Sequence, residues 1–305
     1  MNLFKKLKKH FSESPGPFKA LIFMALASVL FVAMHTLVRD LSKNLHPFQI
    51  AFFRASLGLI VLSPIIFKNQ FAILKTGKIK LHALRGLLNA AAMLCFFYGL
   101  SITPLAQVTA LSFAVPLFAT VLAVFVLGEV IKIRRITALI IGFFGTLIII
   151  RPGIIELGIG PILILLQAFI WSLALMVIKV LTRTDSSLTI AIYASIFLSP
   201  IVLIAAIPVW QTPTINQFIL MLVIATFGTI AQTFMNESLK LGETSIVMPV
   251  EFTRMVWAAI FGYCFFGEVP DIFTWIGAIL IFGSTAYIAL RESNLKKKLE
   301  SNPSS

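Results

Sequence analysis

Charge is scarce in this sequence: only 12% of its 305 residues are charged, whereas 59% are hydrophobic. Water-soluble domains carry about 25% charged residues, so this balance excludes an ordinary soluble fold. Several uncharged apolar runs exceed the ~18 residues that suggest a helix crossing a hydrocarbon core of ~30 Å. The alternating ~10-residue pattern of an outer-membrane barrel is absent. We therefore predict an all-α integral membrane protein.

Other absences narrow the chemistry. The chain has two cysteines, Cys95 and Cys264, both within apolar runs where a thiol behaves as a small hydrophobe and implies no disulfide. It contains no G-x-x-x-x-G-K-[ST] motif for nucleotide binding, no H-E-x-x-H and no Cys/His cluster. We expect no ATP-driven pump within the chain, no cofactor, no metal and no catalytic residue.

Acidic residues are the other scarce group, because 12 Asp and Glu stand against 25 Lys and Arg, a net charge of +13. Such a charge can indicate nucleic-acid binding, but here the basic residues lie in short links between apolar spans rather than on one soluble face. Membrane orientation explains them better. We expect a small-molecule substrate and membrane lipids as partners, and no nucleic acid.

Ten apolar windows cross the sequence, five in each half. The first five cover residues 18–38, 47–67, 82–100, 104–127 and 136–150, and the second five cover 160–181, 187–209, 215–237, 244–266 and 272–290. Residues 1–17 are predicted to be a basic amphipathic segment on the membrane surface, and residues 292–305 a basic, disordered tail. With the N-terminus inside, twenty of the 25 basic residues fall on inner segments and three on outer loops, so both termini are predicted to be cytoplasmic.

The two halves repeat one pattern. The segment Glu243–Glu268 has a counterpart at Pro104–Glu129, and a shift of 139 residues places Gly128-Glu129 on Gly267-Glu268. We therefore predict two repeats, residues 18–153 and 154–291. Because each repeat holds an odd number of spans, the second enters the membrane in the opposite direction. Inverted repeats are typical of secondary transporters, which expose a midplane site alternately to the two sides.

The sequence resembles a known family at these motifs. Leu127-Gly128-Glu129, Phe266-Gly267-Glu268 and the run IIIRPG at 148–153 are similar to EamA-type carriers of the drug/metabolite transporter superfamily. The runs at 51–64 and 85–129 resemble the S-adenosylmethionine uptake carriers of intracellular bacteria. The resemblance implies a secondary transporter of a small metabolite in the bacterial inner membrane, with S-adenosylmethionine uptake as one activity and export of amino acids or related metabolites as the alternative.

Other readings stay open at this point. An integral-membrane enzyme acting on lipid headgroups would need clustered polar residues at one interface, and the sequence shows scattered ones instead. The transporter hypothesis is therefore preferred. Whether the chain acts as a monomer or a homodimer is left open. By resemblance to the family, the fifth and tenth spans are expected at the periphery, away from the cavity, with Ala138, Gly142 and Thr146 forming a small-residue face for close helix packing.

Arg254 is the most unusual charge in the chain, since it lies about ten residues, or ~15 Å, into the ninth span. Glu251 stands three positions earlier on the same helical face, so the two side chains can pair. Two interpretations remain. The pair either only locks helices together, or it acts in transport, with Arg254 binding an anionic group of the substrate or Glu251 taking up a proton.

The other candidate substrate-binding residues share a position inside a span and a polar or aromatic side chain. They are Arg54, the amides Asn89, Gln107, Gln167 and Gln232, and the aromatic residues Trp171, Trp257 and Tyr193. We expect the amides to face the protein interior, because an amide facing lipid is costly, although each has the commoner role of joining helices. Arg54 is close enough to the outer edge for its long side chain to cover much of the distance. His35 is expected at the outer interface rather than as a proton carrier.

Overall fold

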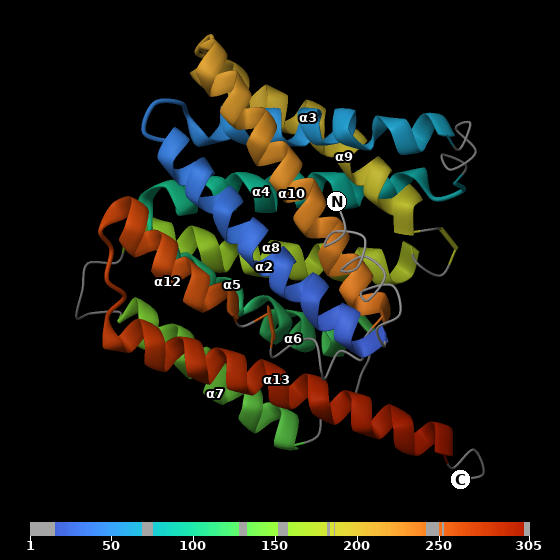
Figure 1. Cartoon of the computed structure of the whole chain (residues 1–305). Coiled ribbons are helices and arrows are strands. Elements are labelled where there is room, and N and C mark those ends of the chain that lie inside the picture. The colour runs from blue at the N-terminus through green and yellow to red at the C-terminus, as the bar shows by residue number, and fades with distance from the viewer. Residues whose placement is uncertain are drawn as a thin grey trace, which may run out of the picture.

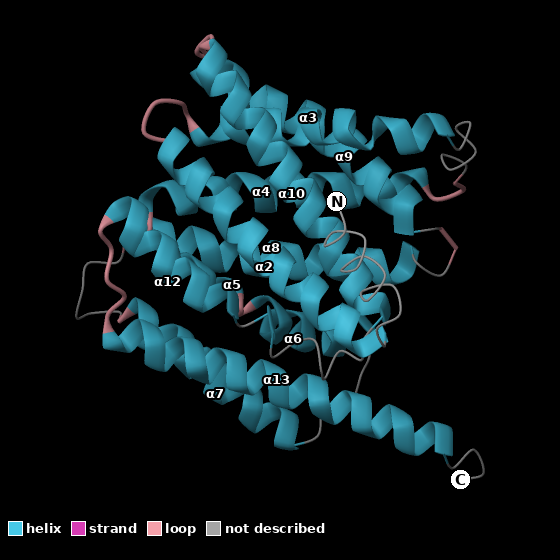
Figure 2. Ribbon diagram, in the orientation of Figure 1, coloured by secondary structure: helices cyan, strands magenta, loops and turns pink. Residues whose placement is uncertain are grey.

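The computed structural model describes residues 16–68, 76–127, 133–151, 158–181, 184–185, 187–241, 250–251 and 253–301, and within these ranges it contains helices and no strand (Figures 1 and 2). The α-helices are α2 (Gly16–Leu41), α3 (Pro47–Lys68), α4 (Ile79–Ile102), α5 (Leu105–Ser112), α6 (Val115–Leu127), α7 (Ile133–Ile150), α8 (Ile159–Leu181), α9 (Ser187–Ala206), α10 (Ile215–Leu241), α12 (Thr253–Phe266) and α13 (Ile272–Ser301). A short 3-10 helix, η2 (Ile207–Val209), follows α9.

The helices are apolar along their length, which is what a lipid environment requires of a segment that must satisfy its own backbone hydrogen bonds. Six described segments are long and apolar enough to cross a membrane, and four more apolar helices are shorter: Pro47–Val61, Ile136–Ile150, Thr253–Phe266 and Ile272–Tyr287. Helices α5 and α6 together form one span, broken at Phe113 and Ala114. These segments confirm the predicted all-α membrane fold of ten spans.

Successive spans run in opposite directions between two faces of the bundle. We call the face where α2 begins the terminal face, on the right in Figure 1, and the face where α2 ends the distal face, on the left. The Ser238 hydroxyl donates to the Ala20 carbonyl at 2.6 Å, which joins the end of α10 to the start of α2 at the terminal face. Because α7 ends at the distal face, α8 begins there, so the second half is inverted relative to the first.

Helix packing follows the inverted repeat. Helix α2 packs on α10 as its equivalent α8 packs on α4, and α3 packs on α10 as α9 packs on α4. Equivalent helices also contact each other, α3 with α9 and α7 with α13, as a pseudo-twofold axis requires. These extensive contacts all join different halves. Neither half therefore buries its apolar helix faces by itself.

The tail differs from its prediction. Helix α13 continues to Ser301, so residues 292–301 are helical rather than disordered. The reason is that leucine, lysine and glutamate are good helix formers and extend a helix that is already nucleated at little cost. Residues 1–15 of the predicted amphipathic segment lie outside the described residues.

Helices α7 and α13 lie together at the lower edge of the bundle in Figure 1. The small-residue face is confirmed, since Ala138 and Thr146 are buried and Gly142 is packed against Leu117 of α6 and Ser284 of α13. The outer surface of α7 is lined by exposed isoleucine, phenylalanine and leucine, as expected of a peripheral, lipid-facing helix. The distal ends of both helices border a cavity at the distal face, described below; the place of the two helices away from the substrate cavity stays a prediction.

The α7–α13 contact provides a test of packing. A methyl group added at Gly145 meets the Gly277 carbonyl oxygen at 2.9 Å, and a backbone atom cannot move aside as a flexible side chain does. We expect Gly145→Ala to destabilise the protein by about 1–3 kcal/mol and to lower its melting temperature in detergent. The matched control is Gly283→Ala in α13, where an added methyl has nothing within 4 Å and the melting temperature should be unchanged or higher. Equal melting temperatures for the two variants contradict close packing at Gly145.

Candidate functional site

The predicted pair at the centre of the second half is formed. Arg254 Nη2 lies 3.2 Å from Glu251 Oε1, and the two side chains are only 15% and 19% exposed. The Arg254 guanidinium carbon also lies 4.8 Å from the centroid of the Phe31 ring of α2, a cation–π contact between the halves. The Nε atom of Arg254 is buried without a hydrogen-bond partner. Glu251 therefore satisfies this guanidinium only in part.

Aromatic rings continue from Phe31 into the first half. Phe31 stacks with His35 at a centroid distance of 6.3 Å, and His35 lies 4.9 Å from Phe96 of α4. His35 is buried, so the expected interface position is wrong. The reason is that α2 continues to Leu41, which places His35 about 9 Å inside the distal end of the helix, on the side that faces α4. Sequence reasoning missed this residue, although its spacing of four from Phe31 places both on one helical face.

Arg54 approaches the same region from α3. An added methyl at Gly228 of α10 would lie 3.2 Å from Arg54 Nη2 and 3.3 Å from its Nε, so the guanidinium packs directly on the α10 backbone. The same position on Gly228 lies 2.7 Å from Met34 Sδ of α2, and Met34 is three residues from Phe31, whose ring faces Arg254. In the described part of the chain, Arg54 makes no hydrogen bond and no ion pair. Two arginines from opposite halves thus lie along one stretch of α2, with one carboxylate.

The predicted amides occupy different surroundings. Asn89 is buried in α4, and Gln167 is half-buried in α8; in each, the side-chain carbonyl oxygen is buried and accepts no hydrogen bond. Gln107 lines a cavity at the distal face. Gln232 departs from the expected interior position: it is exposed, and its amide nitrogen lies 3.3 Å from Asn236 Oδ1 on the same helix. The two amides satisfy each other one turn apart, which reduces the cost of their exposure.

The predicted aromatic residues also separate. Trp257 packs against the main hydrophobic core and Trp171 is half-buried in α8. Tyr193 lies away from the central arginines, because its ring stacks on His82 at 4.7 Å, and His82 begins α4 at the terminal face. The structure therefore brings together Arg254, Glu251 and Arg54, and leaves Tyr193 and Gln232 outside this group.

Glu268 joins the two halves at the distal face. Gly267 has φ of +66°, a conformation that side chains other than glycine rarely adopt, and it turns the chain so that Glu268 lies over Gly262. Glu268 Oε2 accepts from the backbone N–H of Leu105 at 3.0 Å, and Oε1 pairs with Arg39. Glu268 thus caps a helix of the other half. Its counterpart Glu129 lies outside the described residues.

A second ion pair lies beside the first. Arg151, at the end of α7, pairs with Asp271 before α13, and Asp271 also accepts from the Thr274 backbone N–H at 2.8 Å. Burial alone would raise the pKa of Asp271, but the bonds from Thr274 and the charge of Arg151 hold it below the ordinary value. We call Arg39–Glu268 and Arg151–Asp271 the distal bridges. Three residues of these bridges, Glu268, Arg151 and Asp271, line a cavity of about 290 Å³ together with Gln107 and Gly262.

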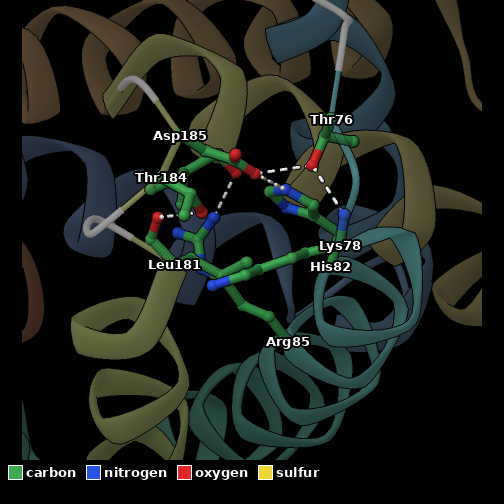
Figure 3. Close-up of polar contacts among 8 residues, drawn as sticks. Thr76, Lys78, His82, Arg85, Leu181, Thr184 and Asp185 are labelled. Carbon is green, nitrogen blue, oxygen red and sulfur yellow. Dashed lines mark hydrogen bonds and ion pairs between the residues drawn. The ribbon is translucent and has the colours of Figure 1, made fainter.

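The terminal face has its own link between halves. Figure 3 shows the Asp185 carboxylate, from the segment after α8, between the Thr76 hydroxyl and the His82 ring. The Thr76 hydroxyl donates to Asp185 Oδ2 at 2.6 Å, and His82 Nε2 lies 2.7 Å from the same oxygen. The His82 and Asp185 side chains are 0% and 6% exposed. Hydrogen bonds from Thr76 and then His82 hold the pKa of Asp185 below its ordinary value.

A ten-span membrane bundle of two inverted halves, with a charged pair at its centre and ion pairs across its ends, defines a membrane transporter. The model of the EamA-like transporter family matches residues 18–151 and 158–290, and the chain belongs to this family. A transporter rather than an enzyme is therefore indicated.

The relatives of this chain carry names that state different transported compounds. The chain is 31% identical to an S-adenosylmethionine uptake transporter of Rickettsia prowazekii, over 86% of this chain and 88% of that protein. It is 28% identical to a riboflavin transporter of Brucella anthropi, over 81% and 89%. A pseudopaline exporter of Pseudomonas aeruginosa is 26% identical, over 85% and 92%. A solved crystal structure, 15% identical, covers 92% of this chain and 99% of its own with a TM-score of 0.61, which supports the fold alone.

The Asp185 link predicts a dependence of stability on pH. Because the pKa of Asp185 is lowered in the folded protein, its stabilising effect is complete above the ordinary value of 3.8 and is lost as pH falls through the lower folded value. At pH 7, Asp185→Asn should lower the melting temperature by roughly 2–4 °C. The difference from wild type should shrink as pH falls below 3.8 and through the lowered pKa of Asp185. The control Asp40→Asn removes an exposed pair with Lys43 and should change little at either pH; a constant difference for Asp185→Asn contradicts the assignment.

Proposed function

We propose that this chain is a secondary transporter that imports S-adenosylmethionine, or a closely related zwitterionic metabolite, across the bacterial inner membrane. The relative in Rickettsia prowazekii, named for S-adenosylmethionine uptake, supports the substrate class. The excess of basic residues on the inner segments supports placing both termini, and so the terminal face, in the cytoplasm.

The observation that carries this proposal is the buried Arg254–Glu251 pair beside aromatic rings. S-adenosylmethionine presents a carboxylate, an ammonium, a sulfonium and a flat adenine. A guanidinium matches the carboxylate through its planar fork, a carboxylate matches either cation, and the rings of Phe31 and Phe96 match the adenine or the sulfonium. Riboflavin carries no comparable charged group, so the site fits it less well. An amino-acid exporter remains the alternative, since amino acids share the carboxylate and the ammonium.

The ends of the bundle support alternating access as the mechanism. The distal bridges and the His82–Asp185 bond each join one half to the other. The distal bridges are partly exposed, and such ion pairs contribute little to stability, about 0–1 kcal/mol each, so they can open and re-form as the halves rock. Packing between apolar helices holds the remainder of the interface.

Transport is tested with purified protein in liposomes. We expect saturable uptake of labelled S-adenosylmethionine into protein-containing vesicles and none into empty vesicles. A panel of unlabelled methionine, adenosine and riboflavin separates the competitors, and riboflavin should compete least. Saturable flux of riboflavin or of an amino acid without flux of S-adenosylmethionine overturns the substrate assignment.

The central pair is tested by removing its charges singly and together. Arg254→Met and Glu251→Gln each leave one buried charge unpaired, which costs about 3–5 kcal/mol and lowers the amount of folded protein. The double variant leaves no charge unpaired, so its abundance should approach that of wild type. We expect the double variant to lose at least about 100-fold in uptake. Normal uptake by the double variant contradicts a role for the pair in transport and leaves it as a brace between helices.

A further inference from the structure

The centre of the bundle holds more positive charge than its described side chains neutralise. Arg254 makes one contact of 3.2 Å with Glu251, and its Nε has no hydrogen-bond partner among the described residues. Arg54 makes no hydrogen bond or ion pair in the described ranges, although it lies among packed helices. Desolvation makes an unmatched guanidinium unfavourable in such surroundings. A ligand that brings an anionic group corrects this imbalance.

We infer that Arg54 and Arg254, one from each half, hold the carboxylate of the transported ligand between them, while Glu251 faces its cationic group. This inference rests on the proposed function and names the ligand class as an α-amino acid or a derivative with a free carboxylate. Both guanidinium groups lie along the same turn of α2: Arg254 faces the Phe31 ring, and Arg54 packs with Met34, three residues further on, against Gly228. Guanidinium groups bind carboxylates through two parallel hydrogen bonds, and their planar shape fixes the carboxylate orientation.

Comparison with the other described arginines supports a ligand role for Arg54. Arg39 pairs with Glu268, Arg151 pairs with Asp271, and Arg85 donates to the Ile190 carbonyl. Each of these three joins two helices or helix ends through an acceptor of the protein. Arg54 has none of these acceptors, so the bracing role that accounts for the other arginines does not account for it.

Gly228 acts as a positioning residue for Arg54. The guanidinium rests on the α10 backbone because Gly228 has no side chain, and a methyl there would come within 3.2 Å of Nη2. Gly58 offers a matched comparison on the same α3–α10 interface, since a methyl added there meets Thr229 Oγ1 at an ordinary 3.6 Å. Gly228→Ala therefore crowds Arg54, and also Met34 Sδ, which the added methyl would meet at 2.7 Å, without changing any charge, whereas Gly58→Ala leaves both side chains in place.

The inference is tested by binding to purified protein in detergent, with S-adenosylmethionine and decarboxylated S-adenosylmethionine as the two probes. Wild type should bind the carboxylate-bearing probe about 10- to 100-fold more tightly. Arg54→Gln should reduce this ratio to about threefold or less. If the carboxylate of the probe binds Arg54, removing the carboxylate costs little affinity once Arg54 is gone. Lys43→Gln, an exposed cation, should leave the ratio unchanged. Gly228→Ala should reduce the ratio, and Gly58→Ala should preserve it.

The outcomes separate this inference from the proposed function. If wild type takes up S-adenosylmethionine but Arg54→Gln keeps the full ratio, the carboxylate assignment is overturned and the transport proposal stands. If wild type binds neither probe, both fall. Should Arg54→Gln fail to yield monodisperse protein, Arg54→Lys keeps the charge and loses the planar fork, and it should still reduce the ratio at least about fivefold. An unchanged ratio in Arg54→Lys together with Gly228→Ala overturns the inference.

Discussion

The need to satisfy arginine side chains inside an apolar bundle organises this structure. A guanidinium keeps its charge at any physiological pH and carries five N–H donors, so burial forces it to find acceptors. Arg39 and Arg151 find carboxylates near the distal face, Arg85 finds a carbonyl near the terminal face, and Arg254 finds Glu251 between them. Three of these four contacts join helices of different halves. The charges therefore lie where the halves meet.

Phenylalanine rings accompany the same charges. Arg39 lies 4.5 Å from the centroid of Phe266, Arg151 lies 4.7 Å from that of Phe273, and Arg254 lies 4.8 Å from that of Phe31. A ring face stabilises a cation without adding a second charge, and it keeps the surroundings apolar enough for the membrane. This arrangement explains how a chain with few acidic residues accommodates buried arginines, since each carboxylate is supplemented by an aromatic face.

The sequence permits prediction of whatever depends on neighbours along the chain. Long apolar runs predict the spans, the 139-residue shift predicts two halves, and the i−3 spacing predicts the Arg254–Glu251 pair. Contacts between halves are not local, so the partner of Glu268 on α5 was not predictable from spacing. Gly267 before it was a usable signal, because a glycine that ends a helix often has positive φ and redirects the next residue.

The residues whose surroundings were wrongly predicted were misplaced for one physical reason. Whether a side chain on a helix faces lipid, a neighbour or a cavity depends on which helix packs beside it, and periodicity carries little of this information when every face is apolar. Gln232 was expected to face the protein interior because exposing an amide to lipid is costly. Its amide nitrogen instead donates a hydrogen bond to Asn236 one turn away, which lowers that cost. His35 was expected at the interface because the first span was estimated to end at residue 38, but α2 continues for three more residues, almost one turn. Tyr193 was grouped with the central residues as an aromatic side chain within a span, and such a position does not show which helices surround it.

The inverted arrangement gives the central arginines a mechanical meaning for the proposed alternating access. Arg54 belongs to α3 of the first half and Arg254 to α12 of the second, so one ligand group bound by both is a contact between the halves. The distal bridges and the Asp185 link are contacts of the same kind at the two ends. A ligand shifts a conformational equilibrium only by its differential affinity for the two states. A substrate group held by both halves must differ in affinity between the two states. The reason is that rocking one half against the other changes the distance between Arg54 and Arg254.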